Sequence, residues 1–209
     1  MSVSDCASLA GNATKIAARG FGWTHAGRSE AALSDIDVVI EPGERVLLCG
    51  DSGSGKSTLL AAMAGVLGSD EEGTRTGELL LEDSSGLVEE PGHTIPVGLV
   101  LQDPDSQVIS ARVGDDIAFG CENLAYPREE IWRRVTAAKE LVGPFVDLDF
   151  PTERLSGGQK QRLALAGVIA MGAGVVLLDE PTANLDPAGA RDVVRAVSRP
   201  VSYTHLTLP

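Results

Sequence analysis

A glycine-rich octet at Gly50–Ser57, with the sequence Gly-Asp-Ser-Gly-Ser-Gly-Lys-Ser, constrains this chain more than any other segment. It follows Arg45–Cys49, a short apolar run typical of a buried parallel strand, and it leads into Lys56–Ala64, which has helical composition. Glycines allow the backbone to wrap so that successive N–H groups point at phosphate oxygens. A chance Gly/Ser turn is the alternative, but the flanking strand and helix favour a phosphate-binding loop (P-loop).

The residues of this loop have separate expected roles. The ammonium of Lys56 would contact the β and γ phosphates, and the Ser57 hydroxyl would bind Mg²⁺. The positive end of the following helix would add to the attraction for phosphate. The residues expected around the nucleotide are Gly50, Asp51, Ser52, Gly53, Ser54, Gly55, Lys56, Ser57 and Thr58.

A second acidic motif lies 123 residues after Lys56, where the apolar run Val175–Leu178 ends in Asp179 and Glu180. An aspartate at the end of a strand beside a P-loop can hold Mg²⁺. The next carboxylate is placed to orient and deprotonate an attacking water. Alone, such a run could be an ordinary transition from core to surface, but a P-loop upstream makes it a strong indication of nucleotide hydrolysis.

The segment Leu155–Gln159, Leu-Ser-Gly-Gly-Gln, is the most discriminating part of the chain. Ser156 and Gln159 fit a capping box that opens a helix. Two glycines at a positive helix end would expose amides and form a second anion site. Local chemistry alone favours an ordinary capped helix.

Between a P-loop and an acidic strand end, however, this segment resembles the signature of ABC ATPases, and the resemblance covers almost the whole chain. It implies an α/β fold, with a P-loop NTPase (RecA-like) core, an N-terminal antiparallel β subdomain and an inserted helical subdomain at about 105–155. It also implies Mg²⁺-dependent ATP hydrolysis, a second ATPase subunit in a head-to-tail dimer, and a transmembrane transporter subunit. In that dimer Ser156, Gly157, Gly158 and Gln159 would contact the nucleotide of the other subunit.

The same resemblance assigns further residues. Glu180, Gln102 and Lys56 would be catalytic, and Ser57, Gln102 and Asp179 would hold the metal ion. Trp23 falls where an aromatic side chain stacks on adenine, and a core aromatic is the less favoured alternative. Asn184–Asp186 matches the D-loop, which places Asp186 at the nucleotide.

A subfamily is also indicated. Leu101–Gln107 and Asp115–Gly120 are similar to ATPases of energy-coupling-factor (cobalt-type) importers, which take up vitamins or transition-metal ions. We expect Phe119 and Trp132 to be core residues rather than binding residues. The cargo itself cannot be predicted, because membrane or binding subunits select it.

The remaining elements follow from residue patterns. Strands are expected at 14–19, 35–41, 77–81 and 97–101, and a helix at Glu129–Val142 has Ile131, Val135 and Ala138 on one face. Strands alternating with helices indicate a parallel α/β core. The uncharged run Leu163–Leu178 has 16 residues, short of the roughly 20 that span a bilayer. We expect it to form a buried helix, a glycine turn and a buried strand.

Composition restricts the partners. The net charge is −13 and no long stretch is basic, which disfavours extended nucleic-acid binding. Three cysteines without a CxxC pair indicate a reducing compartment. The cysteines thus favour the cytoplasm, and the resemblance implies a location on the inner face of the membrane, which the protein would meet only through its partner. The rivals are a soluble ABC ATPase that acts at ribosomes or DNA, and an ATP-binding module that hydrolyses poorly.

The C-terminal residues depart from the family pattern. ABC ATPases carry a switch histidine on a strand after the D-loop helix, and His205 is the only histidine after Asp186. The chain between them is too short for the usual loop and strand, so His205 is not assigned this role. We expect no strand after Ser198, a truncated domain, and a non-native tail at about 202–209.

This interpretation predicts that the 209-residue chain binds Mg-ATP but hydrolyses it about 10²–10⁴-fold more slowly than a version with a natural C-terminus. Phosphate release from both, and from His205→Ala, provides the test. Turnover at the full rate that is abolished by His205→Ala would contradict the interpretation.

Overall fold

The computed structural model describes residues 13–67, 72–183, 185, 187, 189–191 and 204–207. These residues form two compact units. The sheet unit contains the described residues up to Leu99, together with Gly174–Asp179 and 204–207. The helical unit contains Val100–Ala173 and the described residues from Glu180 to Arg191.

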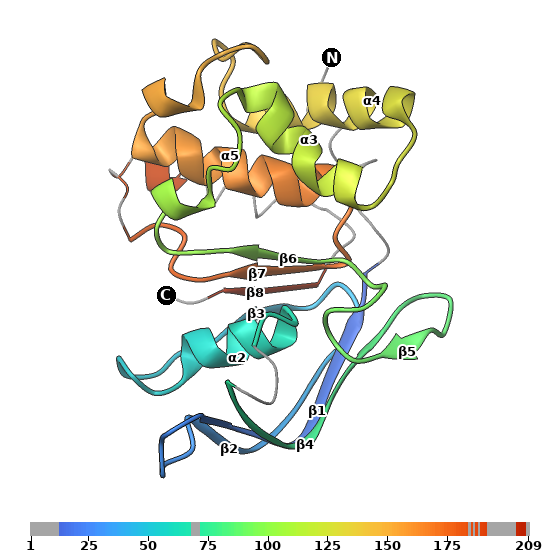
Figure 1. The fold of residues 1–209 in the computed structure, drawn as a ribbon, viewed down its shortest axis with the longest axis vertical. Helices are drawn as coiled ribbons and strands as arrows, with labels where there is room; N and C mark the ends of the chain where they lie inside the picture. Colours follow the sequence, from blue (N-terminus) through green and yellow to red (C-terminus); the bar gives the residue numbers. More distant parts are fainter. Residues whose placement is uncertain are drawn as a thin grey trace. The chain divides into compact units, whose positions relative to one another are not determined.

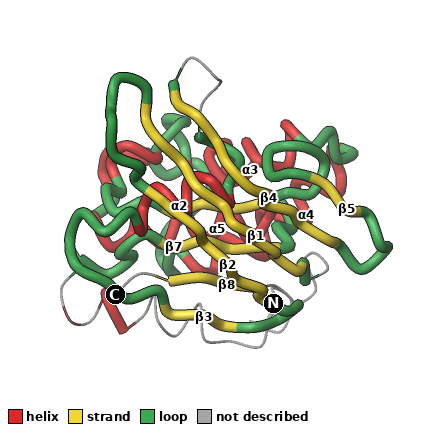
Figure 2. Tube along the Cα trace, turned by 90° about the horizontal axis from the view of Figure 1, so that it is seen from below, coloured by secondary structure: helices red, strands yellow, loops and turns green. Residues whose placement is uncertain are grey.

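The sheet unit contains the antiparallel sheet that the sequence predicts. Its strands are β1 (Lys15–His25), β2 (Leu33–Ile40), β4 (Gly73–Glu82) and β5 (Val88–Glu89), in the order β2-β1-β4-β5. Figure 2 shows β2, β1 and β4 side by side. Ile16 in β1 pairs with Ile40 in β2 and Leu81 in β4, and all three side chains are buried.

Strand β1 extends beyond the predicted 14–19. A bulge interrupts the alternation of buried and exposed residues that identifies a strand, and the strand continues after the bulge. The register with β4 shifts between Arg19 and Gly22. Gly20 and Gly77 have φ angles of 54° and 67° there. A Cβ atom on Gly77 would lie 2.2 Å from the Gly20 carbonyl oxygen, so no other residue fits without movement of the backbone. The strand continues beyond this point to Trp23 and His25.

A second sheet has the order β3-β8-β7-β6, and its strands are β3 (Arg45–Leu47), β8 (Thr204–Thr207), β7 (Val175–Leu178) and β6 (Val97–Val100). Strand β8 is parallel to both β3 and β7. Helix α2 (Lys56–Met63) lies between the two sheets (Figure 1). Its buried residues Leu60 and Met63 belong to one core cluster with residues of both sheets, including Phe21 and Leu177.

The expectation that no strand follows Ser198 is wrong. The backbone of Thr204–Thr207 pairs with β3 through Arg45 and with β7 through Val175. This short segment has two β-branched threonines, which suit an extended backbone. His205 therefore lies in a strand next to β3, while the non-native origin of 202–209 stays a prediction.

The helical unit consists of α3 (Val113–Asn123), α4 (Arg128–Ala138) and α5 (Gly157–Ala170), with 3₁₀ turns at η1 (Asp105–Gln107), η2 (Lys139–Leu141) and η3 (Thr152–Arg154). Helices α3 and α4 both contact α5. The predicted face of Ile131, Val135 and Ala138 is buried. Because α5 packs with the other helices, this unit extends beyond the predicted 105–155.

Phe119 and Trp132 are not core residues, contrary to expectation. Their exposed fractions are 39% and 36%. Trp132 is one position from the buried Ile131, which turns it about 100° away around α4. Phe119 lies two positions from both Ile117 and Cys121 in α3, which are fully buried, so it projects from the opposite side.

The uncharged run Leu163–Leu178 folds as predicted. Helix α5 ends at Ala170, Gly172 turns the chain with a φ of 74°, and β7 is buried throughout. Within the described ranges, no helix has the length and apolar character to cross a bilayer.

Leu60 tests the role of α2 in the core of the sheet unit. Its side chain is 1% exposed, so Leu60→Ala should lower the free energy of unfolding by about 2–5 kcal/mol through lost burial and a residual cavity. Leu47→Ala is the control, because Leu47 is 61% exposed and should change stability by about 0.5 kcal/mol or less. Equal losses in urea unfolding would contradict the assignment.

Candidate nucleotide site

The P-loop adopts a tight turn between β3 and α2 that only glycine allows at two positions. Gly53 and Gly55 have φ angles of 81° and 89°. A Cβ atom on Gly55 would lie 2.5 Å from the Ala32 carbonyl oxygen. Gly55 is also the N-cap of α2, and it has no side chain to accept from the first N–H groups of the helix. These N–H groups therefore have the geometry of an anion site.

Lys56 lies folded over this loop. Its ammonium donates hydrogen bonds of 2.8 Å to the carbonyl oxygens of Gly50 and of Asp51. An ammonium has three donor hydrogens, so one remains for a phosphate oxygen while the other two hold the loop. The positive charge is thus fixed at the turn where the sequence predicts the β and γ phosphates.

Topology brings the P-loop and Asp179 to one edge of the sheet. The P-loop follows β3 and Asp179 follows β7, and both strands run parallel to β8 between them. Carboxyl ends of parallel strands meet at one edge, where open α/β sheets bind ligands. The Ser57 hydroxyl and the Asp179 carboxylate are the hard oxygen donors that Mg²⁺ prefers, so these residues fit that ion.

Within the helical unit, Gln102 and Glu180 meet although they are 78 positions apart in the sequence. The side-chain amide of Gln102 donates a 2.9 Å hydrogen bond to the Glu180 carboxylate. Glu180 has a φ of 44°, which a residue other than glycine rarely adopts. Two of the three residues predicted to be catalytic are therefore in direct contact.

The predicted capping box at the start of α5 is present. The Gln159 backbone N–H donates to the Ser156 hydroxyl at 3.3 Å, and the Ser156 N–H donates to the Gln159 side-chain oxygen at 2.9 Å. Gly157, just inside the helix, is exposed, and a Cβ atom there would have nothing within 4 Å. The signature segment is thus an ordered helix end with an open surface.

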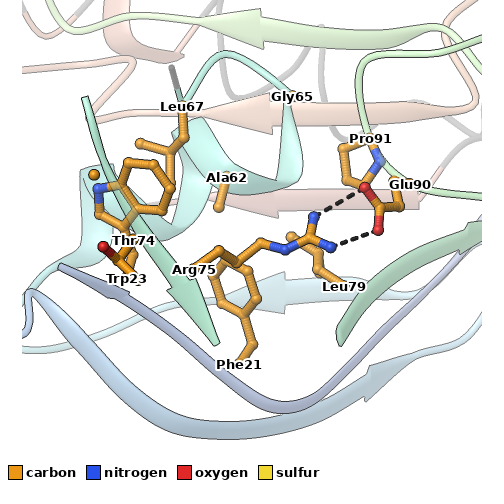
Figure 3. Close-up of a pocket in the computed structure, with 11 residues that line it drawn as sticks. Phe21, Trp23, Ala62, Gly65, Leu67, Thr74, Arg75, Leu79, Glu90 and Pro91 are labelled. Carbon is orange, nitrogen blue, oxygen red and sulfur yellow. Dashed lines mark hydrogen bonds and ion pairs between the residues drawn. The ribbon is translucent and has the colours of Figure 1, made fainter. Parts of the chain in front are cut away.

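Trp23 is a core residue in this structure, which is the alternative that the sequence left open. It is 5% exposed, and its indole N–H donates to the His25 ring at 3.2 Å. Figure 3 shows it lining a cavity of about 650 Å³ with Phe21 and Leu67. The adenine-stacking role of Trp23 stays a prediction, and it would require a more exposed ring.

Two polar contacts were not predicted from the sequence. Arg75 pairs with Glu90 through two hydrogen bonds, one of 3.0 Å, at the cavity shown in Figure 3, and this pairing lowers the pKa of Glu90. Asp116 in α3 accepts from the backbone N–H groups of Ile109 and Ser110 at 2.8 and 2.9 Å. Burial raises the pKa of Asp116, although these N–H groups oppose the effect. For Asp116 a sequence signal existed: the apolar Val113 and Ile117, three residues before it and one after it, place Asp116 on a buried helical face.

The predicted D-loop residues Asn184 and Asp186 lie outside the described residues, so their role stays a prediction.

Comparison with known proteins decides the family. The family model described as "ABC transporter" matches residues 33–183, a stretch that includes the P-loop, the signature segment and Glu180. The chain belongs to the ABC transporter family.

Individual relatives agree with this assignment. The chain is 41% identical over 172 residues to the energy-coupling factor transporter ATP-binding protein EcfA1 of Caldanaerobacter subterraneus subsp. tengcongensis. The aligned residues cover 82% of this chain and 61% of that protein. It is 40% identical to an ABC transporter ATP-binding protein of Methanosarcina mazei, covering 88% of this chain and 32% of that protein. This ABC-family chain thus spans between about a third and three fifths of the length of these relatives.

A solved structure supports the same conclusion. The cbiO1 protein of Clostridium perfringens has a TM-score of 0.74 and 31% identity, with 92% of this chain and 77% of that chain covered. The P-loop NTPase fold predicted from the sequence is confirmed by this likeness.

Lys56 provides the direct test of nucleotide binding. Lys56→Ala removes the cation of the P-loop and leaves the backbone amides in place, so the Kd for ATP should rise about ten-fold or more. Lys15→Ala is the control, because Lys15 is a partly exposed lysine of the same unit that pairs with Glu41. Isothermal titration calorimetry measures both, and unchanged affinity in a folded Lys56→Ala variant would contradict the site.

Proposed function

We propose that this chain binds Mg-ATP at the P-loop and hydrolyses it to drive substrate transport through a partner membrane protein. The observation that supports this most strongly is the placement of the P-loop and Asp179 at one edge of the parallel sheet, with Glu180 directly after Asp179. Backbone amides and Lys56 would bind the phosphates, and Ser57 and Asp179 would hold Mg²⁺. Bound Mg²⁺ would neutralise charge on the phosphates.

Glu180 is the proposed general base. Its carboxylate would accept a proton from the attacking water, and the amide of Gln102 would orient that carboxylate through the 2.9 Å hydrogen bond. Gln102 is also the proposed third metal ligand, through its amide oxygen. Hydrolysis would need such a hydrogen-bonded carboxylate directly after the proposed metal ligand in the sequence, and a pure binding module would not need it.

The transport role and its cargo class are proposed from the relatives. The Caldanaerobacter protein is named an energy-coupling factor transporter ATP-binding protein, and cbiO1 is described as part of the ABC transporter complex cbiONQ. The Leu101–Gln107 segment supports the same subfamily. We therefore propose uptake of a vitamin or a metal ion, with this chain bound to the inner face of the membrane through its partner.

The complete active site is proposed to need two copies of the chain, arranged head to tail. The open helix end at Ser156–Gln159 would then contact the ATP bound by the other copy, as the resemblance of this segment implies. A single copy would bind ATP but hydrolyse it poorly.

Glu180→Gln tests the base and the dimer together. Glutamine keeps the shape and can still accept from Gln102, but it cannot take a proton, so hydrolysis should fall by about 10²–10⁴-fold while ATP binding persists. Analytical ultracentrifugation with Mg-ATP should then show a trapped dimer. Glu129→Gln, an exposed acid on α4, is the control and should change neither result. A monomer at all concentrations would overturn the composite site.

A further inference from the structure

Gln161 is a polar residue at a core position of α5. It is 2% exposed and lies on the buried stripe with Leu165, Val168 and Ile169 at helical spacing. An apolar side chain would serve packing at this position without the cost of burying an amide. The hydrogen bond that this amide makes is therefore the feature to explain.

That hydrogen bond reaches the segment that contains Gln102. The Gln161 amide donates to the carbonyl oxygen of Leu101 at 3.1 Å, across 60 positions of sequence. Leu101 is the residue immediately before Gln102. A contact from the buried side chain of Gln161 in α5 thus fixes the backbone next to Gln102, whose amide bonds to Glu180.

A second glutamine completes this support. The Gln107 side chain accepts from the Leu101 N–H at 2.9 Å and donates to the Leu101 carbonyl at 3.0 Å and to the Asp103 carbonyl at 3.2 Å. The backbone on both sides of Gln102 is therefore held by side-chain amides. Lys160, the neighbour of Gln161, also forms an ion pair with Asp105 of the same segment.

We propose that Gln161 is a positioning residue: its buried amide fixes the Leu101 carbonyl and thereby sets where Gln102 meets Glu180. This inference rests on the proposed function for its effect on hydrolysis, but its structural part stands independently. The hydrogen bond of Gln161 goes to the residue before Gln102 and Gln161 is not part of the P-loop sequence, so its removal should affect turnover rather than nucleotide affinity.

Gln161→Met removes the donor and keeps an unbranched side chain of similar length. Amide hydrogen exchange in the peptide 101–107 should become about three- to ten-fold faster, as expected for the loss of one buried hydrogen bond. The kcat for ATP should fall about ten-fold or more, because small displacements of catalytic groups are costly, while KM and the Kd for ATP stay within about two-fold.

The matched control is Thr152→Val in the same unit. Thr152 is 3% exposed, and its hydroxyl donates a 2.7 Å hydrogen bond to the Ser110 carbonyl, so the variant also removes a buried bond from side chain to backbone. It should speed exchange around Ser110 and leave both the 101–107 peptide and kcat unchanged.

Three outcomes for Gln161→Met would overturn the inference: an unchanged exchange rate at 101–107, a uniform increase of the exchange rate across the helical unit, or a local increase at 101–107 without loss of kcat. An equal fall of kcat in Thr152→Val would also count against it. If the parent chain binds ATP but releases no phosphate, the proposed hydrolysis fails, and the exchange measurement still decides whether Gln161 fixes the segment.

Discussion

The buried face of α2 is the contact on which the rest of the sheet unit depends. Leu59, Leu60 and Met63 share one core with the antiparallel sheet on one side and with β7 on the other. This contact holds the first turn of α2 in place, and the P-loop is the connection between that turn and β3. The left-handed glycine conformations of the loop are supported because the loop runs from the paired strand β3 into the packed helix α2.

In the helical unit, the hydrogen bonds of Gln161 and Gln107 hold the segment around Gln102 in place, as the packing of α2 holds the P-loop. Gln102 lies on an irregular segment, where a long side chain would otherwise sample several rotamers. Gln161 and Gln107 supply the order that regular secondary structure does not. Neutral amides suit this task, because they donate and accept in fixed directions without adding charge beside Glu180.

Several features that depend on local patterns could be predicted from the sequence, but the run Arg45–Cys49, expected to be a buried strand, forms the edge strand β3, in which Leu47 is 61% exposed. The P-loop, the capping box at Ser156 and the buried strand at Val175–Leu178 each have a short signature, and the structure contains all three. Trp132 could also have been placed correctly, because the helical period that identified Ile131 and Val135 turns Trp132 away from them.

Other features depend on residues far apart in the chain. The bulge at Gly20 is set by its contact with Gly77, so the length of β1 could not be predicted from β1 alone. The burial of Trp23 depends on Gly73, because a Cβ there would lie 2.3 Å from the indole ring. The contact between Gln161 and Leu101 needs the tertiary fold, and its only local sign is a glutamine on an apolar stripe.

The sheet unit is built from stretches of chain that the helical segment Val100–Ala173 separates in the sequence, and this affects how the protein can fold as it is synthesised. Val175 and Leu177 belong to the same core as Ile16 and Phe21, yet the whole segment from Val100 to Ala173 is translated between them. The helices of that segment rely on nearer neighbours in sequence and can form while the first strands still lack their core partners. Until β7 has been synthesised, the strands of the sheet unit therefore lack part of their core, and the exposed apolar surface favours aggregation during that interval.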